Sequence, residues 1–275
     1  MPHATIVRDS LPHFCDTTDR LIGRGGDEGW MTGIPTRPQT VREAVHGLMR
    51  AFGMTTVFGN PGSTELPFFR AWPDDFAYIL GLQEAASVAM ADGFAQVTRR
   101  PALVNLHSAA GVGNAMGSVH TAWRNATPLV ILAGQQSRSL LALDPYLHAL
   151  QATELPRPYV KWSHEPARSS DVPSAFARAV YTAMQPPRGP VFLSVPADDW
   201  DAPAELVDVR PYSTSIAPDP ATLRRLADAV SASHSPAFIV GPAVDRDGAW
   251  DAMVALAERA RAAVWVSPFS ARCSF

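Results

Sequence analysis

Apolar residues between positions 38 and 200 occur in two alternating arrangements. Short continuous runs, rich in Val, Ile, Leu and Phe, predict strands that are buried on both faces. The stretches between these runs carry apolar residues three and four positions apart, which predicts amphipathic helices. The alternation predicts an α/β fold built on a doubly wound parallel sheet. The strand runs are TTVFG, FAYILGL, PALVNLH, TPLVILAG and GPVFLSVP, and the helical stretches include residues 40–53, 83–98 and 111–126.

The same periodicity divides the chain into four segments. Residues 1–37 lack sustained periodicity and contain a cluster of Gly and Pro, so we expect a flexible N-terminal extension. Residues 38–199 hold the predicted sheet, and residues 200–220, with four prolines, are typical of a linker. Residues 221–275 start a second α/β domain with two helices and two strands, too few to bury both faces of a sheet. We therefore expect this second domain to be incomplete.

Composition and charge narrow the class of protein. The 275 residues are 47% hydrophobic and 18% charged, with a formal net charge of −3, which describes a globular chain and does not favour a nucleic-acid partner. Cys15 and Cys273 lie near opposite ends without metal-ligand spacing, which argues against a disulfide framework and fits a reducing compartment. The sequence has no apolar run long enough to span a membrane and no signal-peptide pattern. We expect a cytoplasmic protein without a membrane partner.

Two residues with possible chemistry follow predicted strands. Ligands of parallel sheets bind beyond the carboxyl ends of the strands, where both Glu84 and His107 lie. Glu84 opens a helix of small residues, where burial would raise the pKa of its carboxyl group and suit it to sharing a proton with a ligand. Alternatively, it is a first-turn acid that favours the helix dipole. His107 is placed for acid–base work or is bonded to loop backbone.

Two glycine-containing segments, residues 59–64 and 107–113, are predicted to be loops at this edge of the sheet. The first, GNPGST, lacks the Lys of a phosphate-binding P-loop, and its Ser63 either points its hydroxyl at a ligand or caps the following helix. The second leads into GVGNAMG, whose glycines are spaced one residue too widely for the dinucleotide fingerprint. It also lacks the acidic residue expected downstream, which argues against a nicotinamide site. Its glycines offer a backbone cradle for polar or anionic groups.

Taken in order, these motifs resemble one family. The segments FGNPGS, LQEAASVAMADGFAQ, LHSAAGVGNAMG and PLVILAG resemble the N-terminal pyrimidine-binding domain of thiamine-diphosphate-dependent enzymes, over about residues 38–205. Within the family, LHSAAG, AGQQSR, LPRPYVKWS and GPVFLSVPADDWD resemble decarboxylases of aromatic 2-oxo acids such as benzoylformate. Most other members have Thr or Ser where this chain has His107. An acetolactate-synthase-like enzyme of the same family is the alternative.

The resemblance implies a role for each candidate residue. Glu84 would bond the pyrimidine ring of the cofactor and promote loss of the thiazolium proton. Ser63 would orient the substrate carboxylate, and His107 would transfer protons. In the loop LLALDPYLHAL, Tyr146 and Leu147 would lie against an aromatic substrate. Further contacts to the cofactor are assigned to Asn60, Pro61, Gly62 and Asn114.

The resemblance also implies what lies outside the chain. The family binds the diphosphate of its cofactor through Mg²⁺ in another domain, marked by a GDG motif that the 275 residues lack. It implies thiamine diphosphate and Mg²⁺ as cofactors, a small 2-oxo acid as substrate, and a homo-oligomer, a dimer of dimers, with sites between subunits. We expect the N-terminal part of a decarboxylase, inactive by itself. A non-catalytic half-site subunit that needs a partner chain is the other possibility.

Overall fold

A six-stranded parallel sheet forms the centre of the first part of the protein. The computed structural model describes residues 39–268. All neighbouring strands in the sheet run parallel, in the order β3-β2-β4-β5-β7-β6, which confirms the predicted α/β fold. The strands are β2 (Thr56–Asn60), β3 (Ala77–Leu80), β4 (Ala102–Leu106), β5 (Leu129–Gln135), β6 (Ser163–His164) and β7 (Val191–Pro196).

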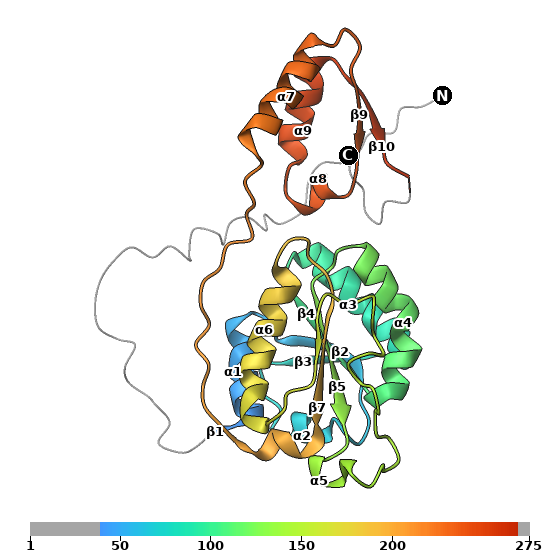
Figure 1. Cartoon of the computed structure of the whole chain (residues 1–275), viewed down its shortest axis with the longest axis vertical. Coiled ribbons are helices and arrows are strands. Elements are labelled where there is room, and N and C mark those ends of the chain that lie inside the picture. Colours follow the sequence, from blue (N-terminus) through green and yellow to red (C-terminus); the bar gives the residue numbers. More distant parts are fainter. Residues whose placement is uncertain (1–38, 269–275) are drawn as a thin grey trace, which may run out of the picture. The chain divides into compact units, whose positions relative to one another are not determined.

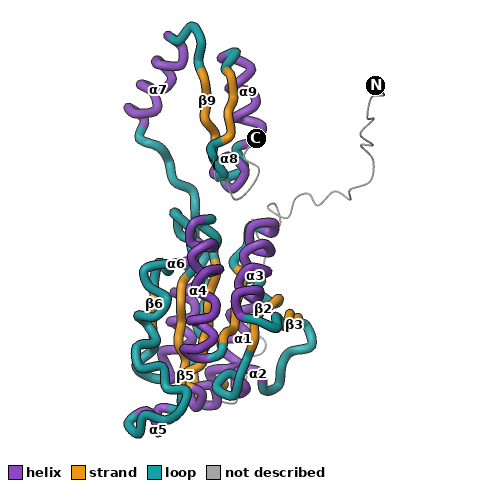
Figure 2. The backbone as a smooth tube through the Cα atoms, turned by 90° about the vertical axis from the view of Figure 1, so that its right-hand side faces the viewer, coloured by secondary structure: helices purple, strands orange, loops and turns teal. Residues whose placement is uncertain are grey.

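Helices cover both faces of this sheet (Figures 1 and 2). One face carries α1 (Val41–Ala51) and α6 (Val172–Met184), and the other carries α3 (Glu84–Thr98) and α4 (Ser108–Arg124), which lie side by side. The core under α1 and α6 contains large aromatic side chains, whereas the core under α3 and α4 is built mainly from Val, Leu and Ala. Small side chains allow α3 and α4 to approach the sheet and each other closely.

The strand order places the loops after β2 and β4 next to each other. From β2 the chain passes to β3 through α2 (Leu66–Phe69) on the aromatic face, and from β4 it passes to β5 through α4 on the opposite face. Connections that leave neighbouring strands in opposite directions open a crevice at the carboxyl ends of those strands. The sequence candidates Asn60, Gly62 and His107 therefore meet at this switch point.

Local sequence signals account for the start of α1. Thr40 is its N-cap: the Glu43 N–H donates to Thr40 Oγ1 over 3.2 Å, and the Thr40 N–H donates to Glu43 Oε2 over 2.9 Å. This reciprocal pair is a capping box. Gly53 follows the helix with φ of +68°, a conformation that favours glycine. The helix predicted over residues 40–53 is confirmed.

Two predictions near the site differ from the structure. The loop predicted over residues 107–113 is wrong, because α4 starts at Ser108, directly after β4 and His107. The Gly111 N–H donates to the His107 carbonyl over 2.8 Å, so Gly111 already belongs to the helix and does not form a loop cradle. After residues 59–64, in contrast, only the four-residue α2 forms, and its N-cap is Glu65, so Ser63 is not the cap.

The C-terminal part of the described chain is a small α/β unit. It contains the parallel strands β9 (Ala237–Val240) and β10 (Ala263–Val266), with α7 (Pro220–Ala232), α8 (Ala243–Arg246) and α9 (Trp250–Ala260). Apart from α8, these elements match the helices and strands predicted for residues 221–268. Residues 205–219 have no helix or strand.

The start of the predicted linker belongs to the first part of the protein. Trp200 is 2% exposed in a 3₁₀ helix (Ala197–Asp201), and β8 (Pro203–Ala204) pairs antiparallel with β1 (Gln39–Thr40). The predictions for residues 1–37, Cys15 and Cys273 concern residues outside the described range.

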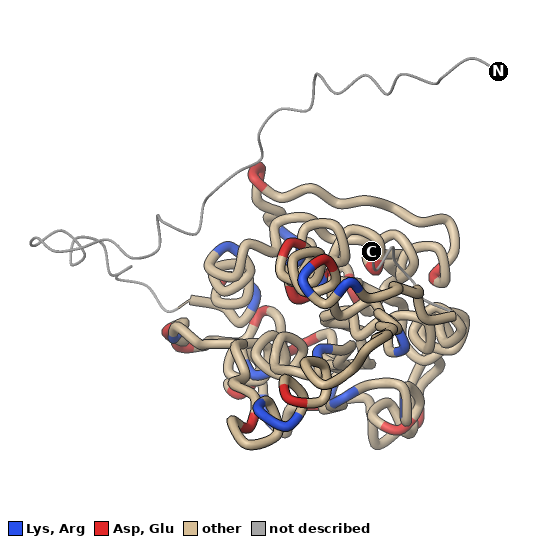
Figure 3. The backbone as a smooth tube through the Cα atoms, turned by 90° about the horizontal axis from the view of Figure 1, so that it is seen from above, with Lys and Arg blue, Asp and Glu red and all other residues tan. Residues whose placement is uncertain are grey.

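Charged residues of both signs are interspersed along the described chain (Figure 3). Within residues 39–268, no helix is both long and apolar enough to cross a bilayer.

Candidate active site

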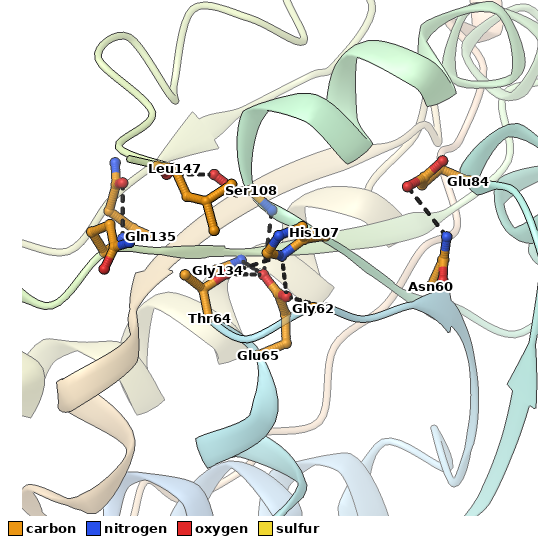
Figure 4. A network of polar contacts seen from close by, with 11 residues as sticks. Asn60, Gly62, Thr64, Glu65, Glu84, His107, Ser108, Gly134, Gln135 and Leu147 are labelled. Atoms are coloured by element: carbon orange, nitrogen blue, oxygen red, sulfur yellow. Dashed lines mark hydrogen bonds and ion pairs between the residues drawn. The ribbon is translucent and has the colours of Figure 1, made fainter. Parts of the chain in front are cut away.

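Glu84 is the first residue of α3 and is 9% exposed. Its two carboxylate oxygens accept long hydrogen bonds from two side-chain amides, Asn60 Nδ2 at 3.3 Å and Asn114 Nδ2 at 3.2 Å (Figure 4 shows the first). Within residues 39–268, no Lys, Arg or His pairs with this carboxylate. Glu84 is thus a buried carboxylate with only two weak donors, and it can form a stronger bond with a ligand.

Glu65 is a second buried carboxylate, with 1% exposure and a very different environment. It lies after β2 and reaches across the ends of β4 and β5 (Figure 4). Five hydrogen-bond donors surround it, so its acceptor capacity is largely used within the protein. The donors are Gly62 N–H at 2.8 Å, the Thr64 hydroxyl at 2.7 Å, His107 Nδ1 at 2.8 Å, Ser108 N–H at 3.3 Å and Gly134 N–H at 2.8 Å.

The Glu65 carboxylate orients the imidazole of His107. Since an ionised carboxylate only accepts hydrogen bonds, the proton of the neutral ring lies on Nδ1, and Nε2 keeps its lone pair. The imidazole also packs flat against Gly62: a Cβ at that position would lie 2.2 Å from Nδ1. The His107 side chain is 23% exposed, so the ring has one fixed side and one accessible side. This arrangement suits a proton donor or acceptor acting through Nε2.

Gly111 brings Glu84 and His107 to one place. A Cβ on Gly111 would lie 3.3 Å from Glu84 Cγ and 3.5 Å from His107 Cβ. At the other two glycines of the motif, Gly113 and Gly117, such a Cβ would have no neighbour within 4 Å in the described part of the chain. Of the three glycines, Gly111 is therefore the one needed for close approach within residues 39–268, and both candidate catalytic side chains pack against it.

Backbone strain accompanies the site. Ser108 has φ of +48° and Leu147 has φ of +75°, both in the left-handed region that costs non-glycine residues about 1–2 kcal/mol. Ser108 is held by its N–H bond to Glu65 and by its hydroxyl, which donates to the Leu147 carbonyl over 2.7 Å. These bonds tie the loop around Leu147 to the start of α4.

The loop that carries Tyr146 and Leu147 has further anchors at the end of β5. Gln135, 1% exposed, donates to the Ala149 carbonyl and accepts from the Ala149 N–H, each over 2.9 Å. Gln136 Nε2 donates to the Tyr146 carbonyl over 2.6 Å. The backbone of the loop is therefore fixed although its side chains vary in exposure.

The structure brings most of the sequence candidates together. Glu84, Asn60 and Asn114 form one cluster, and His107, Gly62 and half-buried Leu147 lie in or beside the other. Two candidates point outward: Ser63 is exposed with no hydrogen bond to another described residue, and Tyr146 is 90% exposed. Half-buried Pro61 lies between the two clusters in sequence.

Sequence reasoning missed Glu65, although it singled out two of its hydrogen-bond donors, Gly62 and His107. Glu65 follows the same strand as Asn60, and a carboxylate after a parallel strand was the argument that singled out Glu84. The remaining donors, above all Gly134, carried no recognisable signal. A Cβ on Gly134 would lie 2.2 Å from Glu65 Oε1, so this glycine is required by a residue 69 positions earlier.

Within residues 39–268, no group of three or more His, Cys, Asp and Glu side chains is arranged to hold a metal ion.

Residues 39–155 match the family described as the thiamine pyrophosphate enzyme N-terminal TPP binding domain, thiamine pyrophosphate being another name for thiamine diphosphate. The matched range contains both carboxylates, His107 and the loop with Leu147. Residues 39–155 are therefore similar to the N-terminal domain of thiamine-diphosphate-dependent enzymes.

Individual relatives include aromatic 2-oxo acid decarboxylases. Benzoylformate decarboxylase of Pseudomonas aeruginosa is 50% identical over 241 residues, which cover 86% of this chain and 46% of the relative. The crystal structure of benzoylformate decarboxylase from Polynucleobacter necessarius superposes with a TM-score of 0.84 and 50% identity, covering 86% of this chain and 45% of that one. The 4-hydroxybenzoylformate decarboxylase of Rhodococcus jostii RHA1 gives a TM-score of 0.83 and 44% identity, with 86% and 46% covered. The chain spans a little under half the length of these relatives.

Proposed function

We propose that the protein takes part in thiamine-diphosphate-dependent decarboxylation of an aromatic 2-oxo acid of the benzoylformate kind, giving an aldehyde and CO₂. The observation that carries this proposal is the pairing of a weakly bonded buried carboxylate, Glu84, with an oriented imidazole, His107, on either side of Gly111. The 50% identity to a benzoylformate decarboxylase supports the choice of substrate class.

The environment of Glu84 fits the aminopyrimidine ring of the cofactor. A ring nitrogen can share a proton with a carboxylate. The carboxylate of Glu84 is buried, and among residues 39–268 it has no cationic partner and only two long hydrogen bonds. The absence of a side chain at Gly111 keeps the space beside Glu84 open. When bound, thiamine diphosphate supplies the electron sink that lets CO₂ leave. Glu84 would hold or move the proton at the pyrimidine, with Asn60, Pro61, Gly62 and Asn114 as neighbouring contacts.

His107 would transfer protons at the substrate. Its Nδ1–H is bonded to Glu65, so Nε2 is the nitrogen that would donate or accept a proton at the carbon that loses CO₂. Glu65 would act through His107 by fixing its tautomer and, when the ring is protonated, by balancing its charge. This division leaves one carboxylate for the cofactor and one for the histidine.

The substrate would be recognised by the loops around the pair. Ser63, exposed at the turn after β2, has a free hydroxyl for the substrate carboxylate. Leu147, held beside Ser108, offers an apolar contact for an aromatic ring, and Tyr146 would have to turn inward when substrate binds.

The remaining requirements concern the whole protein. We propose that Mg²⁺ and the cofactor diphosphate bind outside residues 39–268, that the active form is a homo-oligomer, a tetramer, with each site shared between subunits, and that the protein is cytoplasmic. We also propose the predicted division of the chain with a shorter linker: residues 38–204 as the pyrimidine-binding domain, 205–219 as a linker and 220–275 as part of a second domain.

A chimera tests the proposal directly. Residues 39–268 of this chain would replace the matched segment of the Pseudomonas aeruginosa benzoylformate decarboxylase, and the product would be assayed with benzoylformate and with pyruvate. We expect benzaldehyde and CO₂ from benzoylformate, and loss of that activity in a Glu84→Gln chimera. A folded chimera that binds cofactor but acts only on pyruvate would contradict the proposal and favour an acetolactate-forming enzyme.

A further inference from the structure

Three buried polar atoms near the site have no hydrogen-bond partner among residues 39–268. They are Nδ2 and Oδ1 of Asn105 and the phenolic Oη of Tyr78, each almost fully removed from the surface. Asn105, 1% exposed, lies on β4, two residues before His107. Buried polar groups without partners are rare in native proteins, and an internal water molecule is a common explanation.

Tyr78 of β3 and Asn105 of β4 flank Gly59 of the intervening strand β2. Gly59 pairs with Asn105 across the sheet and with Leu80 of β3 on its other side. A Cβ on Gly59 would lie 2.5 Å from Tyr78 Oη and 2.3 Å from the backbone oxygen of Asn105. The missing side chain therefore lets the phenol reach over β2 toward β4.

This pair lies on the same face of the sheet as Glu65. Asn105 points to the aromatic face, together with Leu103 of the same strand. Its partner across β5 is Leu132, two residues before Gly134, whose N–H binds Glu65. The Asn105 amide is thus one pleat deeper in the protein than the Glu65 carboxylate. Burial, and to a smaller extent the charge of Glu65, raise the pKa of Tyr78, as expected for a phenol close to that carboxylate.

We propose that Asn105 and Tyr78 bind an internal water molecule on the inner side of the Glu65–His107 pair. The amide offers one donor and one acceptor and the phenol offers either, so one water can find the two to four partners that it needs. Asn105 and Tyr78 are positioning residues in this arrangement: they stabilise the sheet under Glu65 and touch neither cofactor nor substrate.

Nuclear magnetic resonance of the ¹⁵N-labelled 275-residue chain tests the water directly. We expect a rotating-frame Overhauser cross-peak between the Asn105 side-chain amide protons and the water resonance. A phenol proton that exchanges with solvent could give the same signal. The Tyr78→Phe variant removes that proton, and the cross-peak is expected to persist. Loss of the cross-peak in Tyr78→Phe, or its absence in the wild type, would overturn the proposal.

Thermal unfolding gives an independent readout. If water bridges the two side chains, Asn105→Leu and Tyr78→Phe should each lower Tm, by about 2–4 °C, and the double variant should lose clearly less than the two shifts added together. If the atoms are simply unpaired in a dry core, both variants should leave Tm unchanged or raise it, and their effects should add. The second pattern would contradict the proposal.

Discussion

Glu65 Oε2 lies 2.8 Å from Nδ1 of His107, and this carboxylate is more deeply buried than any other acidic side chain in residues 39–268. All of its hydrogen-bond partners among residues 39–268 are donors, and they bond to both of its oxygens. An amide of the same shape has only one acceptor oxygen, so it cannot replace the Glu65 carboxylate.

Glu65→Gln is expected to destabilise the protein by about 2–3 kcal/mol, because the new NH₂ group faces N–H donors and leaves at least one of them unpaired. Urea unfolding at pH 7 measures this loss. The ¹⁵N shifts of the His107 ring should also show a changed tautomer population. Glu205→Gln, at an exposed position, is the matched control and should change neither quantity. A Glu65→Gln variant as stable as wild type would show that the five donors do not require a carboxylate.

Gly111 and Gly113 provide a matched pair of substitutions in one helix. Gly113→Ala should stabilise the protein by about 0.5–1 kcal/mol, since Ala is the better helix former and the added Cβ meets nothing within 4 Å. Gly111→Ala should lose this gain or reverse it, because its Cβ comes within 3.3 Å of Glu84 Cγ. The Asn60 side-chain amide resonance should move in Gly111→Ala only. Equal stabilisation by both substitutions would contradict this prediction, because it would show that the Glu84 side chain can move away from the new Cβ without a loss of stability.

His46 predicts a loss of stability in mild acid. It lies on α1, 4% exposed, with edge-on contacts to Phe68, Trp72 and Phe76. Burial, reinforced by the charge of Arg42, lowers its pKa from 6.5 to about 4. Between these values the unfolded chain binds a proton that the folded protein does not, so stability falls as the pH drops from 6.5 to 4, by about 3 kcal/mol in total.

The measurement is urea unfolding at pH 7.5 and pH 5.0 for wild type and for His46→Leu. The variant should lose less stability over this interval, whereas His234→Gln, at an exposed position, should behave as the wild type does. An identical decline in His46→Leu would assign the acid sensitivity to other groups.

Arg138 holds the start of the loop that leads to Leu147. Its guanidinium makes two bonds of 2.7 Å to Asp199, which is 2% exposed, and this hydrogen-bonded pair raises the pKa of the arginine. Arg138→Gln should lower the free energy of unfolding by about 3–5 kcal/mol, because it leaves the buried carboxylate of Asp199 without its cation. Arg138→Lys should lose less stability than Arg138→Gln, since lysine supplies the positive charge but not the two parallel hydrogen bonds. If Arg138→Gln proves harmless, the Asp199 carboxylate must be hydrated in the folded protein.

The sequence was sufficient to predict those site residues whose position depends only on where a strand ends. Glu84 and His107 follow two parallel strands, so the fold class alone predicted that they lie at the same edge of the sheet, and the family resemblance added Asn60 at the end of a third strand. It was insufficient where the site depends on contacts across the sheet. Glu65 was not singled out because its role depends on hydrogen bonds from Gly134 and Ser108. These residues are distant in sequence and come close to Glu65 only in the folded protein. Helix α4 begins at Ser108 and not at residue 111 as predicted, because residues 107–113 were expected to form a loop at the end of a strand. Of its three glycines, Gly111 is the one that packs closely against other described residues.

The five donors to Glu65 also bear on the order of folding. They come from the ends of β2, β4 and β5, so the carboxylate can lose its hydration only after these three strands have paired. A carboxylate dehydrated earlier would be buried without partners, at a high cost in free energy. Interactions that form after the rate-limiting step act on the unfolding rate and hardly on the folding rate. The Glu65 cluster should therefore make the native protein slow to unfold, and the partly exposed imidazole of His107 is thereby held in an element that opens rarely.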